Sequence, residues 1–164
     1  MSDASPVATV TYADRWSNRK GRMVRPLTED EAQGRHDRGQ LYTAVLGDSE
    51  RPEAYLEVRL EAGFVGVHFL DEKLRNHLTY LFTRSPEGQG DLFLEQVTRR
   101  VYNDSGDPTH DEHYVFEGPN QAHVEKRDHA TQEAETYDLE TDLSQNHEPP
   151  PAFGDYDSIA RVER

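Results

Sequence analysis

Residues 54–70, AYLEVRLEAGFVGVHFL, constrain the fold most, because apolar side chains recur at every second position on each side of Ala62-Gly63. Pairing position 60 with 65, 58 with 67 and 56 with 69 places six apolar side chains on one face. A slip of one residue would set a valine against a glycine, so the pattern specifies the register. The sequence predicts a β-hairpin here, with Glu57 opposite His68 on its polar face.

Similar alternation predicts further strands along the chain. Residues 91–102 fit either a helix or a strand buried on both faces, and we favour a strand because adjacent antiparallel pairing is the commonest connection between neighbouring strands. The other predicted strands lie at 7–12, around 23–24, at 77–83 and at 134–143.

Helix signals are few. Thr28 followed three residues later by Glu31 forms a capping box, which predicts one short helix near residues 29–38. Asp157 is placed to cap a second, short C-terminal helix. The fold class predicted is therefore mainly β: an antiparallel curved sheet or partial barrel with these two helices.

Length and composition indicate one domain. A chain of 164 residues suits one core and is short for two. We expect a flexible N-terminal tail at 1–6, a single antiparallel β-rich domain at 7–143, and a proline-rich segment at 144–164 packed on that domain. Three consecutive prolines exclude a central strand in that last segment, and Phe153 and Tyr156 offer it apolar contacts.

The charge of the chain is strongly negative, with 32 acidic and 18 basic residues giving −14. Residues 41–164 hold 26 acidic and 11 basic residues, so this body carries −15. It disfavours nucleic acid, despite the basic segment around Trp16, and it speeds association with a basic protein. Two simpler explanations stay open, since acidity alone keeps a protein soluble and can also reflect a salt-adapted source.

The chain has no cysteine, which excludes disulfide bonds and any chemistry that needs a thiolate. No apolar run approaches 18 residues, and the start MSDASPVATV lacks a basic or apolar leader. We expect a cytoplasmic protein without a membrane segment and without a cofactor.

An acidic face is predicted where alternation resumes near the C terminus. Asp138, Glu140 and Asp142 are spaced two apart, so a strand projects them from one side, and Glu125 adds a further carboxylate. Such carboxylates repel one another unless a cation, a basic partner or water lies over them. These four residues are the candidate binding site for a basic protein partner.

The segment 110–129, HDEHYVFEGPNQAHVEKRDH, predicts a hairpin in which the numbers of paired residues sum to 239. In this register His113 and His123 point to opposite faces and do not bind one ion. The same register sets His110 opposite His129, on the face that carries Glu112.

Two histidines and one carboxylate can hold iron or zinc with an open coordination position, so His110, Glu112 and His129 are a candidate metal site. A solvated hairpin end is the simpler interpretation of the same residues. The sequence does not decide whether the protein is an enzyme, because it contains no phosphate loop, nucleophile elbow or H-E-x-x-H pair.

The opening strand VTYADRW, followed by an acidic, cysteine-free chain with antiparallel strands, resembles small bacterial immunity proteins of contact-dependent and polymorphic toxin systems. The resemblance implies a protein that blocks a toxin's active cleft with an acidic face. The function predicted is thus an acidic binding or inhibitory module for a basic protein partner. The alternative is a small-ligand-binding or metal-dependent enzyme that uses His110, His129 and a cavity in a curled sheet lined by Tyr80, Phe82, Tyr114 and Phe116.

Overall fold

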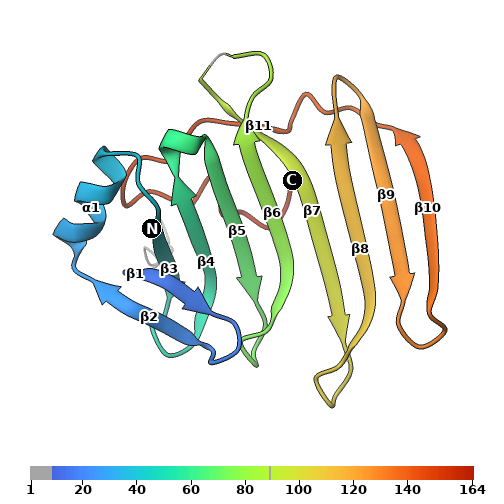
Figure 1. Ribbon diagram of the computed structural model, residues 1–164, viewed down its shortest axis with the longest axis horizontal. Coiled ribbons are helices and arrows are strands. Elements are labelled where there is room, and N and C mark those ends of the chain that lie inside the picture. Colours follow the sequence, from blue (N-terminus) through green and yellow to red (C-terminus); the bar gives the residue numbers. More distant parts are fainter. Residues whose placement is uncertain (1–8, 89) are drawn as a thin grey trace, which may run out of the picture.

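The computed structural model describes residues 9–88 and 90–164 and shows one antiparallel sheet of eleven strands (Figure 1). Ten strands follow the order β10-β9-β8-β7-β6-β5-β4-β3-β1-β2, and β11 pairs separately with the start of β7. The mainly β, antiparallel fold class is confirmed, and the described strands do not close into a barrel. The strands are β1 (Val10–Ser17), β2 (Arg22–Leu27), β3 (Tyr42–Gly47), β4 (Pro52–Arg59), β5 (Phe64–Leu70), β6 (Asn76–Arg84), β7 (Leu92–Tyr102), β8 (Pro108–Glu117), β9 (Gln121–Asp128), β10 (Glu133–Glu140) and β11 (His147–Glu148).

The predicted first helix is present as α1 (Glu29–Asp37). Its capping box is formed: the Glu31 amide donates to Thr28 Oγ1 at 3.1 Å, and the Thr28 amide donates to Glu31 Oε2 at 2.9 Å. A short 3-10 turn, η1 (Leu60–Ala62), follows β4.

The predicted C-terminal helix is wrong, because residues 157–160 form a turn with a single helical hydrogen bond to Tyr156. The carbonyl groups that a helix would use are bound by side chains instead. Arg164 donates to the carbonyls of Ser158 and Ile159, and the Tyr80 hydroxyl donates to that of Val162. A helix of one turn would not offset the free energy lost with these contacts, because nucleating a helix is costly.

The hairpin of β4 and β5 is confirmed, but its predicted register is wrong by two residues. Val58 pairs with Val65, and Leu56 with Val67. The cause is η1, which lengthens the connection and ends at Gly63 in the left-handed conformation, φ 62°. A shift of two keeps every side chain on its face, so the apolar face survives.

Other strand predictions are largely confirmed. The segment predicted as a strand at 91–102 forms β7 from Leu92 onward, and β2 and β6 lie where they were expected. The predicted strand at 134–143 ends at Glu140, and that at 7–12 begins at Val10, with residues 1–8 outside the described part of the chain. The sequence missed β3, which is buried almost throughout and therefore lacks the alternation of a half-buried strand.

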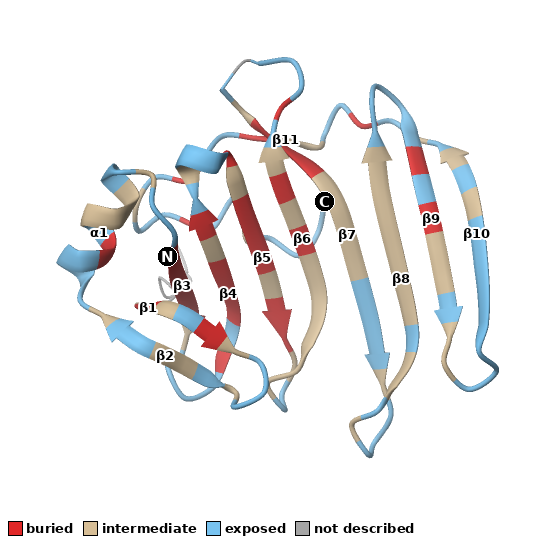
Figure 2. Ribbon diagram, in the orientation of Figure 1, coloured by how far each residue is buried: buried red, intermediate tan, exposed pale blue. Residues whose placement is uncertain are grey.

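The main core lies on one face of the sheet, which we call the covered face; the other is the open face. Buried residues gather on β3 to β6, as the colouring of the ribbon in Figure 2 shows. The C-terminal segment crosses the covered face and adds Tyr156 and Ile159 to the core, while Phe153 stacks on Tyr12 with ring centroids 4.9 Å apart. Phe153 and Tyr156 thus provide apolar contacts between this segment and the sheet.

A buried carboxylate also fastens the C-terminal segment. Glu148 is 3% exposed and accepts hydrogen bonds from Ser158, Arg161 and Arg164. The Arg164 guanidinium lies over the ring of Phe82, 4.8 Å from its centroid. The segment is therefore tied to the sheet by charge as well as by apolar packing.

Candidate binding surface

Strands β8, β9 and β10 extend beyond the core cluster, and we call them the wing. Apart from Ala122 and Val124, their residues are half-buried or exposed (Figure 2). Residues 103–143, which hold the wing and its loops, contain twelve Asp or Glu against Lys126 and Arg127, a net charge of −10. Most of the net charge of the whole chain, −14, therefore lies on this part of the sheet.

Three of the four predicted acidic residues share the open face of the wing. Asp138 and Glu140 project from β10, and Glu125 lies on β9, opposite Thr136. Asp142 lies beyond the end of β10, where its Oδ1 accepts a hydrogen bond from the Ser144 amide at 2.9 Å. That hydrogen bond lowers the pKa of Asp142, so this carboxylate orders a turn and does not extend the strand's row.

The three carboxylates have neighbours but stay accessible to solvent. His123 Nδ1 lies 2.6 Å from Asp138, Arg127 donates to Glu125 at 3.2 Å, and an asparagine donates to Glu140 at 3.0 Å. The side chains of Asp138 and Glu125 are 60% and 43% exposed. Contacts this exposed do not remove the negative field of the surface.

Two acidic residues of β10 were not among the predicted binding residues. Glu133 and Glu135 lie on β10 and project, with Tyr137, from the face opposite Asp138. Glu135 lies within the strand predicted at 134–143 and Glu133 directly precedes it, but the predicted acidic site included only the opposite face of that strand. Carboxylates therefore flank β10 on both of its faces.

The covered face continues across the wing as an aromatic strip. Tyr114, Val124 and Tyr137 lie side by side on β8, β9 and β10, and Phe116 and Leu139 form the next row. Val124 is fully buried beneath its neighbours, whereas the four larger side chains keep part of their surface exposed. The wing thus combines a negative charge with apolar surface on the face that continues the core.

A hollow of about 760 Å³ adjoins this strip, between the sheet and the C-terminal segment. Tyr80 and Phe116 line it, as the cavity prediction required. Phe82 is fully buried in the core, and Tyr114 is not among the lining residues. Only part of the predicted aromatic lining therefore surrounds one space.

The predicted register of the β8–β9 hairpin is wrong by one residue, because the connection from Glu117 to Gln121 contains three residues and not four. A shift of one moves every side chain on one strand to the other face. His113 and His123 consequently share the open face, contrary to the prediction. His113 contacts Gln96 at 3.1 Å, so the two histidines serve different partners.

The same shift separates the predicted metal ligands. His110 lies 3.5 Å from Asp128. His129 lies 2.8 Å from Asp111, and the register of β8 and β9 places Asp111 on the open face. Glu112 accepts a hydrogen bond from the hydroxyl of a neighbouring tyrosine at 3.1 Å. Within residues 9–88 and 90–164, no group of three or more His, Asp or Glu side chains is arranged to hold a metal ion.

A second polar network lies on the open face, around His68. Its Nε2 is 2.6 Å from Glu57, and its Nδ1 is 3.2 Å from both the Thr79 hydroxyl and the Asn76 amide. The hydrogen bond from His68 lowers the pKa of Glu57. The predicted contact between Glu57 and His68 is present, but diagonally, since Tyr55 is the residue opposite His68.

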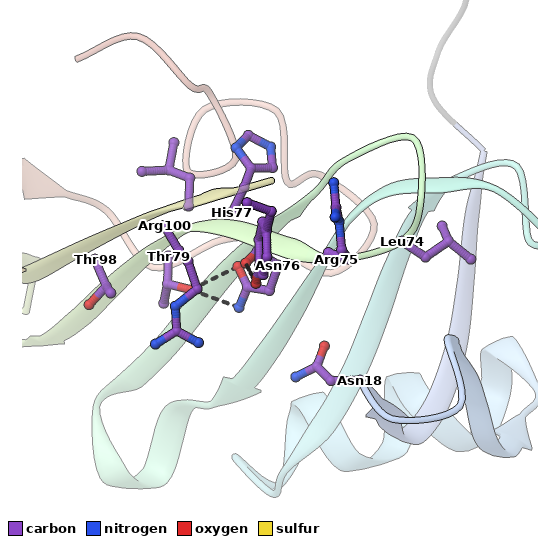
Figure 3. Close-up of a pocket in the computed structure, with 10 residues that line it drawn as sticks. Asn18, Leu74, Arg75, Asn76, His77, Thr79, Thr98 and Arg100 are labelled. Carbon is purple, nitrogen blue, oxygen red and sulfur yellow. Dashed lines mark hydrogen bonds between the residues drawn. The ribbon is translucent and has the colours of Figure 1, made fainter. Parts of the chain in front are cut away.

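A hollow of about 390 Å³ lies beside this network, and Figure 3 shows Asn76 hydrogen-bonded to Thr79 at its wall. Two arginines line it, but Arg75 and Arg100 point in different directions in Figure 3. Each is paired with an aspartate, Arg75 with Asp71 and Arg100 with Asp111. The geometry fits a network that orders this end of the sheet.

Comparisons with known proteins found no family model that matches the chain, and neither a curated protein nor a solved structure that is similar to it. Among the described residues, no helix has both the length and the apolar character needed to cross a membrane. The fold and surface define an open antiparallel sheet with an acidic wing at one end.

Proposed function

We propose that this protein is a binding module that holds a basic protein partner on its wing. The observation that carries the proposal is the net charge of −10 on residues 103–143, outside the core cluster and beside an aromatic strip. Charge of one sign on one surface accelerates encounter with a partner of the opposite sign. Partly exposed tyrosine and phenylalanine side chains supply the apolar contacts typical of interface centres.

The resemblance of VTYADRW to immunity proteins supports a more specific form of the proposal. In that form the partner is the basic active cleft of a secreted toxin, and the protein acts as its inhibitor in the cytoplasm. A toxin gene beside the gene of this protein would supply the partner for a direct inhibition assay.

The experiment compares two variants of equal net charge for binding to cytochrome c, a folded basic protein, by calorimetry at low and physiological salt. The wing variant neutralises the four predicted acidic residues: Glu125→Gln, Asp138→Asn, Glu140→Gln and Asp142→Asn. The control variant neutralises four exposed acidic residues outside the wing: Glu50→Gln, Glu53→Gln, Glu72→Gln and Glu87→Gln.

The wing variant should weaken binding by about tenfold or more and flatten its salt dependence, because attraction between exposed charges is screened over about 8 Å at physiological salt. The control variant should stay within about threefold of the unmodified protein. Equal losses in both variants would mean that net charge alone attracts the probe, and the proposal would be refuted.

A further inference from the structure

We infer that the outer edge of β10 is the docking position on the wing, and that it accepts an extended basic segment of the partner as an additional strand. This inference rests on the proposed function and names the chemistry of the partner. Figure 1 shows β10 as the last strand at one side of the sheet. An edge strand exposes main-chain N–H and C=O groups that can pair with another chain.

The outward-facing groups can be assigned from the hydrogen bonds to β9. The Thr141 amide donates to the Asn120 carbonyl at 2.8 Å, so this position faces β9. Main-chain direction alternates along an antiparallel strand, and the register between β10 and β9 has no bulge. The amide and carbonyl groups that point away from the sheet are therefore those of Ala134, Thr136, Asp138 and Glu140.

The two edges of the sheet are protected differently. On β2, Pro26 has no amide hydrogen and Arg25 has a left-handed backbone, φ 57°, so the main chain itself disfavours a regular added strand. The eight residues of β10 contain neither proline nor glycine, and their pairing with β9 is regular throughout. Among the described residues, this edge is protected by side-chain charge alone.

That charge selects the occupant. Asp138 and Glu140 flank the edge on the open face, Glu133 and Glu135 flank it on the covered face, and β10 contains no basic residue. An acidic strand, including β10 of a second copy, meets like charges on both faces and is repelled. A strand with Lys or Arg gains main-chain hydrogen bonds together with opposite-charge pairs.

The test uses a twelve-residue peptide of alternating arginine and valine as the probe. Thr136→Pro removes one outward amide, leaves the net charge unchanged and breaks no hydrogen bond to β9, and edge strands tolerate proline at such positions. Thr136→Ala is the matched control, which keeps the amide. Thr136→Pro should weaken peptide binding by about tenfold, and Thr136→Ala by no more than about twofold.

Amide hydrogen exchange of the unmodified protein gives a second measurement that does not depend on how the proline variant folds. Bound peptide should slow exchange at the outward amides of Ala134, Thr136, Asp138 and Glu140. If these amides gain no protection, or if Thr136→Pro binds as well as Thr136→Ala, the edge inference is overturned. Loss of binding in the wing variant would then still support the proposed function, which separates the two failures.

Discussion

Replacing Arg164 by glutamine tests whether the C-terminal segment is held by a buried ion pair. Glu148 Oε1 accepts hydrogen bonds from Arg164 at 2.8 Å and from Arg161 at 3.0 Å. The side chains of Glu148 and Arg164 are 3% and 10% exposed, whereas that of Arg161 is 51% exposed. Because both arginines contact the same oxygen, Arg161→Gln is a control matched in chemistry and different in burial.

Removing one partner of a buried pair typically costs about 3–5 kcal/mol of unfolding free energy. Ser158 and Arg161 remain with the carboxylate, so we expect Arg164→Gln to cost about 3 kcal/mol, at the lower end of that range. The exposed pair should contribute at most about 1 kcal/mol. For a chain of 164 residues, the corresponding decreases in Tm are about 6–12 °C for Arg164→Gln and at most about 4 °C for Arg161→Gln.

The assay is urea unfolding followed by circular dichroism, with equal m-values required before the free energies are compared. Cleavage of the C-terminal segment by a protease should also quicken in Arg164→Gln, because its anchor on the sheet is weakened. Equal destabilisation by the two substitutions, or a loss below about 1 kcal/mol for Arg164→Gln, would refute the role of burial in this contact.

Two further outcomes are expected on the open face. Gly66→Ala should destabilise the protein by about 1–3 kcal/mol in urea unfolding. The added Cβ would lie 3.0 Å from His68 Nε2, the atom that contacts Glu57, so the histidine would have to move. Unchanged stability would contradict this packing. The hydrogen bond to Asp138 raises the pKa of His123 above its ordinary value of 6.5. The stability that this ion pair adds to the folded protein is therefore fully present below pH 6.5 and is lost as the pH rises through the raised pKa. In the Asp138→Asn variant, the pKa of His123 measured by NMR titration should fall back toward 6.5. An unchanged pKa in this variant would disprove the pairing.

Local patterns predicted the elements of this fold better than the relations between them. The capping box of Thr28 and Glu31 is satisfied within one turn of chain, so it could be recognised without knowing any neighbour. β3 could not be recognised in this way, because a strand buried on both faces lacks the alternation of polar and apolar residues that marks the period of a half-buried strand.

The candidate site was likewise predicted in part. Alternation placed Asp138 and Glu140 on one face of β10, and the strand pairing brought Glu125 to that face. The partners of His110 and His129 were mispredicted, because a single residue in the β8–β9 connection moves each side chain to the other face. The register of a hairpin depends on the length of its turn as well as on its hydrophobic pattern, and the predicted turn was one residue too long.

The sequence by itself determined that this chain forms an antiparallel sheet and that its C-terminal half is acidic, since strand periodicity and charge are properties of neighbouring residues. Only the tertiary structure decided that β10 is an edge strand and that the negative charge gathers on three adjacent strands. It also decided that the buried Glu148 binds Arg164 and so holds the C-terminal segment against the sheet. These features depend on which segments lie side by side, and strand order is set by packing between residues far apart in the chain.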